Sequence, residues 1–100
     1  MKERDLPRVV NLRHEPYDVY IGRANRRYKL ERSDWHNPFR IGKNCTREEA
    51  VEKYRNYILN RPDLLSRLDE LKGKTLGCWC KPEPCHGDVL VDLVRERLRT

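Results

Sequence analysis

The sequence of 100 residues contains no apolar run close to the roughly 20 residues that span a bilayer, so it predicts no membrane segment. It lacks a Walker-type glycine-rich loop, which argues against a P-loop nucleotide hydrolase. It also lacks the His-x-Glu that precedes the cysteines of zinc deaminases. These absences remove familiar classes of enzyme without naming a replacement.

The opening stretch, MKERDLPRVV, is charged where a secretion signal needs an apolar segment, so we expect a protein of the reducing cytoplasm. In that compartment the four cysteines favour metal binding or thiol chemistry over disulfides. Hydrophobic residues make up 37% of the chain and charged residues 38%, which predicts one small core under an ionic surface. We therefore expect residues 1–100 to form a single domain.

The net charge of +6 is concentrated between residues 20 and 43. Such a block attracts phosphate-bearing partners, so we predict a nucleotide or a nucleic acid as the partner of segment 23–43. An ordinary solvent-exposed loop, with no role in binding, explains the same cluster of basic residues about as well. The segment holds seven basic residues (Arg23, Arg26, Arg27, Lys29, Arg32, Arg40 and Lys43) against two acidic ones (Glu31 and Asp34).

The hydrophobic pattern predicts a small single-domain α/β fold with a mixed sheet and the element order β-β-α-α-β-α. Thr46 and Glu49 stand at the spacing of a capping box at the start of the first helix. The expected strands are residues 8–13, 18–23 and 74–80, and the expected helices are residues 46–60, 62–74 and 85–99.

The long loop up to residue 44 contains the large apolar side chains of Trp35, Phe39 and Ile41, which favours a loop packed over the core. We predict that Arg23, Asn37 and Arg40 contact the ligand, because arginine suits bidentate recognition of phosphate. Asn37 either pairs with a base edge or orders its own loop, as Asn before Pro commonly does. A different possibility is that exposed Trp35 and Phe39 dock onto a protein partner.

The stretch LGCWCKPEPCHGDVL, residues 76–90, holds three of the four cysteines. On a strand, Cys78 and Cys80 share one face, and the next helix begins at Cys85 and His86. Ligands commonly bind beyond the carboxyl end of such a strand, and a helix N-terminus favours a thiolate. We predict Cys85 as the nucleophile, His86 as an acid/base and Cys80 as a resolving or helper thiol. Gly87 would let a phosphate or carboxylate approach the free N–H groups.

The same residues support a metal site, and the sequence leaves open whether the protein is an enzyme. The pattern C-x-C-x4-C-H suits zinc, or less readily an iron–sulfur cluster, with Cys45 or His36 able to replace one ligand. The protein would then be a zinc-stabilised module that binds nucleic acid or protein. Cys78 alone is explained equally by burial in the core. The four ligands would be Cys78, Cys80, Cys85 and His86.

Nearly the whole chain resembles a family of small bacterial and phage proteins known as domain of unknown function 4326. The likeness runs through VVNLR, YIGR, NPFRIG, TREEAVEKYR and LKGKTLGCWCKPEPCHGDVL. It implies that GCWC…CHGDVL and NPF are family motifs, and it brings no activity, substrate or cofactor. The family usually has glycine before Asn-Pro-Phe, where this chain has His36, which argues against a shared role for His36.

Overall fold

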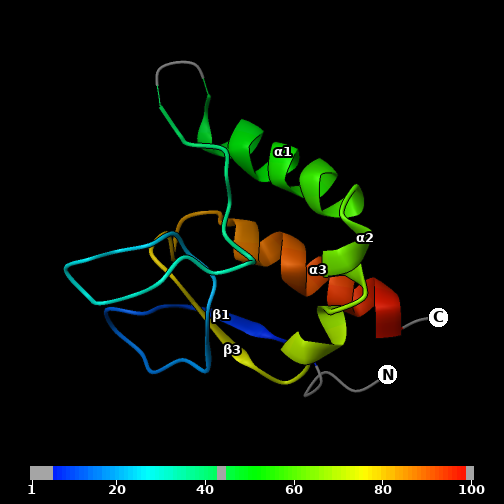
Figure 1. Cartoon of the computed structure of the whole chain (residues 1–100), viewed down its shortest axis with the longest axis horizontal. Helices are drawn as coiled ribbons and strands as arrows, with labels where there is room; N and C mark the ends of the chain where they lie inside the picture. The colour runs from blue at the N-terminus through cyan, green and yellow to red at the C-terminus, as the bar shows by residue number, and fades with distance from the viewer. Residues whose placement is uncertain (1–5, 43–44, 99–100) are drawn as a thin grey trace.

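A computed structural model describes residues 6–42 and 45–98 of the chain (Figure 1). The predicted α/β class and element order are confirmed, and the predicted second helix is split into a short α-helix and a 3₁₀ turn. Lys43, the last residue of the predicted basic segment, lies outside the described residues. The elements are β1 (Arg8–Asn11), β2 (Val19–Tyr20), α1 (Arg47–Leu59), α2 (Pro62–Leu65), η2 (Leu68–Leu71), β3 (Thr75–Cys78) and α3 (His86–Leu98).

The sheet has the order β1-β3-β2, and both strand pairs are parallel. This corrects the expected mixed sheet. Residues 12–18 do not form a hairpin between β1 and β2. They carry the chain past β3, so β2 pairs with the edge of β3 opposite β1. The passage is close, since a Cβ at Gly77 would lie 2.7 Å from Cγ of Tyr17. The missing side chain at Gly77 therefore gives the Tyr17 ring room beside the central strand.

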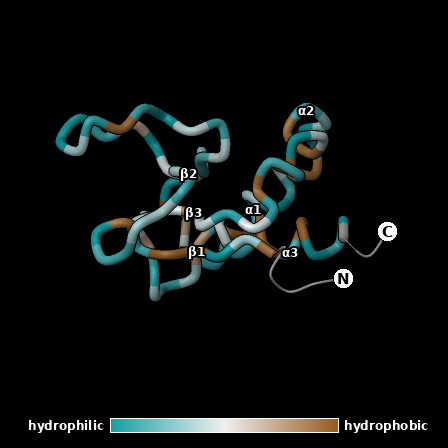
Figure 2. The backbone as a smooth tube through the Cα atoms, turned by 90° about the horizontal axis from the view of Figure 1, so that it is seen from below, coloured by the Kyte–Doolittle hydropathy of each residue, from teal (hydrophilic) through white to brown (hydrophobic). Residues whose placement is uncertain are grey.

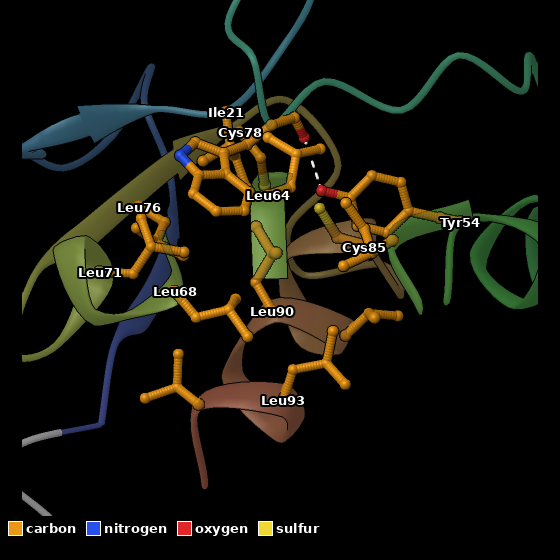
Figure 3. Packing of buried hydrophobic residues seen from close by; sticks show 14 residues of the cluster. Ile21, Tyr54, Leu64, Leu68, Leu71, Leu76, Cys78, Cys85, Leu90 and Leu93 are labelled. Carbon is orange, nitrogen blue, oxygen red and sulfur yellow. Dashed lines mark hydrogen bonds between the residues drawn. The ribbon is translucent and has the colours of Figure 1, made fainter. Parts of the chain in front are cut away.

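Helix α1 begins with the predicted capping box. The N–H of Glu49 donates to Oγ1 of Thr46, and the N–H of Thr46 donates to Oε1 of Glu49. Residues at helical spacing then point inward, and the leucines of α2 and η2 and the apolar face of α3 meet them (Figure 3). The core members from these elements are Ala50, Tyr54, Ile58, Leu64, Leu68, Leu71, Val89, Leu90, Leu93 and Val94.

The described part of the loop between β2 and α1 packs over the core through Trp35, as predicted. Trp35 is only 3% exposed, and its carbonyl accepts a 2.7 Å hydrogen bond from the hydroxyl of Tyr54 (dashed in Figure 3). This burial contradicts the suggestion that Trp35 is exposed for docking. The rest of the loop is mostly hydrophilic and extends away from the helices (Figure 2), beside the carboxyl end of β3. No helix within the described ranges is long and apolar enough to cross a membrane.

Candidate thiol site and its pocket

A pocket of about 440 Å³ lies at the carboxyl end of β3 and brings the two sequence-predicted sites together. The chain segments that follow β2, precede α1 and join β3 to α3 all contribute to its wall. This is the position at which open α/β sheets commonly bind ligands. The predicted residues that line the pocket are Arg23, Asn37 and Arg40 from the basic segment and Cys78, Cys80, Cys85 and His86 from the cysteine cluster.

The three clustered thiols are free and lie within hydrogen-bonding reach of one another through Cys85. Cys78 and Cys85 are each 1% exposed and belong to the core (Figure 3). Cys80 follows the end of β3, is half-buried and lines the pocket. Cys80 is therefore the thiol of this cluster that a ligand in the pocket can reach.

The shared hydrogen bonds separate the pKa values of these thiols. Hydrogen bonding from Cys85 lowers the pKa of Cys80 to about 6, and the guanidinium of Arg47 adds to the effect. Cys78 is the alternative acceptor of the single Cys85 S–H, and that hydrogen bond likewise lowers the pKa of Cys78, to about 7. Hydrogen bonds to both neighbours, followed by burial, raise the pKa of Cys85 far above its ordinary range. Cys85 thus keeps its proton, and Cys80 carries the accessible thiolate.

This arrangement changes the roles expected within the cluster. The predicted effect of the helix N-terminus on Cys85 is present, because the N–H of Gly87 donates to its Sγ over 3.4 Å. It is outweighed by the hydrogen bonds and the burial that raise the pKa of Cys85. The geometry favours Cys80 as the nucleophile and Cys85 as the group that stabilises it.

Arg47 is a site residue that the sequence analysis missed. It is the first residue of α1, and its Nη1 donates to the carbonyl of Pro84 over 3.2 Å. That anchor holds the guanidinium beside Cys80, where its hydrogen bond and charge favour the thiolate. The capping box locates the start of α1 in the sequence, but no local signal places that helix end against residues 80–84.

His86 is buried and neutral. Its Nε2 lies 2.6 Å from the carbonyl oxygen of Ile21. Because a carbonyl oxygen only accepts, Nε2 carries the proton, and the unprotonated Nδ1 faces Sγ of Cys85 at 3.6 Å. Burial lowers the pKa of His86 to about 4. His86 is therefore a neutral imidazole whose unprotonated Nδ1 faces Cys85, and its acid/base role stays a prediction.

The basic residues form one wall of the pocket. Nε and Nη2 of Arg23 donate to the carbonyl of Asn37 over 2.9 and 2.7 Å. Oδ1 of Asn37 accepts the N–H of Phe39 over 2.9 Å, so Asn37 has the loop-ordering role that was one of its two predicted roles. Burial and then the charge of Arg40 lower the pKa of Arg23. The guanidinium groups of Arg23 and Arg40 therefore both belong to the pocket wall. The Asn37 carbonyl links Arg23 to the loop segment that carries Arg40.

Gly87 has a different role from the one expected. A Cβ at this position would lie 2.9 Å from Cδ1 of Ile21, so glycine is needed for α3 to pack on the strands. Gly87 is absent from the pocket wall, and Asp88 occupies part of the predicted anion site. Oδ2 of Asp88 accepts the N–H of Cys85 over 3.1 Å, and Oδ1 pairs with Nζ of Lys81 at 2.6 Å.

The described residues do not fit the predicted metal site. Among them, no group of three or more His, Cys, Asp or Glu side chains is arranged to hold a metal ion. Nε2 of His86 is already bonded to a carbonyl. The proposed substitutes lie apart from the pocket wall, with Sγ of Cys45 donating to the carbonyl of Thr46 and Nδ1 of His36 bonded to the carbonyl of Ser33.

Comparison with known proteins finds relatives in viruses. The chain is 41% identical over 88 residues to "Uncharacterized protein R718" of Acanthamoeba polyphaga mimivirus, covering 78% of this chain and 67% of the relative. It is 35% identical over 94 residues to "Uncharacterized 12.4 kDa protein in nrdA-td intergenic region" of Enterobacteria phage T4, covering 89% and 78%. No solved structure matches the chain. The family model described as domain of unknown function (DUF4326) matches residues 6–96, and the chain therefore belongs to that family.

Proposed function

We propose that this protein uses a thiol-centred pocket to bind and act on a phosphate-bearing ligand, a nucleotide or a nucleic acid, in the cytoplasm. The observation that supports the proposal is the convergence of Cys80, Arg23 and Arg40 on one pocket from three separate parts of the chain. A pocket of about 440 Å³ is within the range of small-ligand sites.

In this proposal each residue has a distinct task. Cys80 is the nucleophile, and Arg47 and Cys85 stabilise its thiolate. A thiolate needs no general base before it attacks, which suits a site whose histidine is buried behind Cys85. Arg23 and Arg40 hold the phosphate, with Arg23 already oriented by the Asn37 carbonyl.

The decisive test is alkylation with iodoacetamide at pH 7, in which the Cys80 sulfur forms a bond to carbon and iodide leaves. Mass spectrometry should place the label at Cys80, and Cys80→Ser should abolish the fast phase. Cys45→Ser is the matched control, because Cys45 lies outside the pocket wall and its loss should change nothing. Unchanged fast labelling in Cys80→Ser would overturn the assignment of the nucleophile.

The ligand is tested in the same assay by protection. A mixture of the four ribonucleoside monophosphates should slow the labelling of Cys80. Arg40→Gln should leave the labelling rate in place and remove the protection, since Arg40 is exposed and belongs to the ligand-binding wall. Failure of both nucleotides and short oligonucleotides to protect Cys80 would refute the phosphate-bearing ligand.

The alternative of a zinc-stabilised binding module makes the opposite predictions. It requires about one zinc per chain in the untagged protein purified without added metal, and unfolding in a strong chelator. The position of His86, with Nε2 on the Ile21 carbonyl, gives this alternative less support than the thiol site.

A further inference from the structure

An aromatic cluster forms the outer side of the pocket and has no task in the proposed chemistry. The ring of Trp79 contacts Tyr28 edge-on with centroids 5.0 Å apart and Tyr20 with centroids 6.5 Å apart. Nε1 of Trp79 donates to the Tyr20 hydroxyl over 2.8 Å, which fixes the indole. The guanidinium of Arg13 lies 5.5 Å from the centre of the same ring. Aromatic rings and a cation are thus held together at one surface.

Tyr28 is the most accessible ring of this cluster, at 46% exposure. It stands in a tight turn that is closed by the pairing of Asn25 with Leu30. Tyrosine and tryptophan rings that are apolar on one side and wet on the other are enriched at interfaces. A turn that fixes the backbone on both sides of Tyr28 keeps the ring in place for such an interface.

Cations surround this ring. Arg26, Arg27 and Lys29 flank Tyr28 and are exposed, and Arg13 reaches the cluster from the loop after β1. Within the part of the chain that the structure describes, none of these four residues forms an ion pair. Their charges are therefore available to a polyanion.

We infer that this aromatic and basic surface, formed by Arg13, residues 25–30 and Trp79, binds a single-stranded nucleic acid. Its bases would stack on Tyr28 and Trp79, and its phosphates would contact the surrounding cations. A duplex hides the faces of its bases, so rings presented in this way select unpaired strands. A single nucleotide has too few phosphates to engage cations both inside the pocket and along the turn.

The inference rests on the proposed function, because it names the ligand class of the same pocket. Tyr20, Asn25 and Trp79 line that pocket together with Cys80. A strand stacked on the aromatic cluster can therefore place one nucleotide beside the thiolate. Trp79 and Cys80 are neighbours in the chain directly after the last residue of β3, which places the indole and the thiol at the same end of the sheet.

Tryptophan fluorescence tests the inference directly. The chain has two tryptophans, and Trp35 is only 3% exposed, so a change on binding reports on Trp79. The probes are a 12-nucleotide oligothymidylate, the same strand annealed to its complement, an oligouridylate and thymidine monophosphate. Either single strand should quench the fluorescence well below the concentrations that the duplex or the monophosphate needs. Trp79→Phe should remove the signal.

Salt dependence measures the phosphate contacts. Four contacts on a single strand predict a slope of about −3 in log affinity against log salt, or roughly a 50-fold loss between 50 and 200 mM. Arg27→Gln should reduce the slope by about 0.7. Affinity that does not change with salt would overturn the inference.

The stacking contact has a matched pair of variants. Tyr28→Ala should weaken binding of the oligonucleotide about tenfold, and Tyr28→Phe should keep the affinity because it keeps the ring. Tyr28→Phe keeps the contact with Trp79 and should leave the melting temperature unchanged, whereas Tyr28→Ala loses that contact and should lower it only slightly. Equal affinity for duplex and single strand, or equal affinity of the two variants, would overturn the inference. If Cys80 proves unreactive while binding still depends on the Tyr28 ring, the proposed function fails and the binding surface stands.

Discussion

Replacing Cys85 with alanine should shift the pH dependence of alkylation at Cys80 to higher pH. The Cys85 thiol is the main cause of the lowered pKa of Cys80, which is about 6. Alanine cannot donate a hydrogen bond, so the pKa of Cys80 should rise toward the ordinary value of about 8.5. Arg47 still acts on Cys80 in the variant, so a full return to that value gives the upper limit of the effect.

The magnitude follows from ionisation and nucleophilicity together. At pH 6 about half of Cys80 is a thiolate in the parent, against about 0.3% in a variant whose pKa is 8.5, a difference of roughly 150-fold. A more basic thiolate is about tenfold more nucleophilic over this pKa range. The variant should therefore react about 15-fold more slowly at pH 6 and about tenfold faster at pH 10, with equal rates near pH 7.5.

The assay is iodoacetamide labelling from pH 5.5 to 10, with fragment-ion mass spectrometry to separate position 80 from positions 78 and 85. Cys85→Ser is the matched control: its hydroxyl still donates, so its profile should lie between those of the parent and Cys85→Ala. Removing one buried sulfur costs about 1 kcal/mol, so the fold should persist. A variant that is slower at every pH would refute the reasoning, because loss of access and not a raised pKa would then be the cause.

Three further predictions concern stability. The pKa of His86 is about 4 when folded and about 6.5 when unfolded, so the unfolded state binds its proton first as pH falls. Denaturant titration should show that the free energy of unfolding falls by about 2 kcal/mol between pH 7.5 and 5. In His86→Gln this fall should be absent. Gly87→Ala should cost about 1–3 kcal/mol through its clash with Ile21, whereas Gly42→Ala, with nothing within 4 Å of its Cβ, should cost little. Trp35→Ala should cost about 3–5 kcal/mol, and an unchanged melting temperature would contradict its core position.

The features that the sequence predicted correctly depend on short-range patterns. Thr46 and Glu49 are three residues apart, so their capping box requires no information from the rest of the fold. The hydrophobic spacing of α1 and α3 identifies their buried faces in the same way. The loop-ordering role of Asn37, one of the two roles predicted for it, needs only a bond from the N–H of Phe39 to Oδ1 of Asn37, which spans two residues.

The features that the sequence left undetermined depend on distant contacts. Part of the lowering of the Cys80 pKa comes from Arg47, which no local sequence pattern could place beside it. The parallel pairing of β2 with β3 brings Tyr17 close beside Gly77, two residues that lie far apart in the sequence. Burial likewise shows which thiol a ligand can reach, because Cys80 is half-buried and Cys85 is fully buried. The sequence alone shows only two cysteines at the ends of a proline-rich loop.

The strand order has a consequence for how the protein folds. Within the described residues, β1 and β2 each pair only with β3, which is made of residues 75–78. A chain emerging from the ribosome therefore cannot form this sheet until residues 75–78 have been synthesised. Such non-local pairing slows folding, because a long loop must close before its contacts form. The clustered thiols and the basic segment accordingly reach their common pocket only after β3 has been synthesised and has joined the sheet.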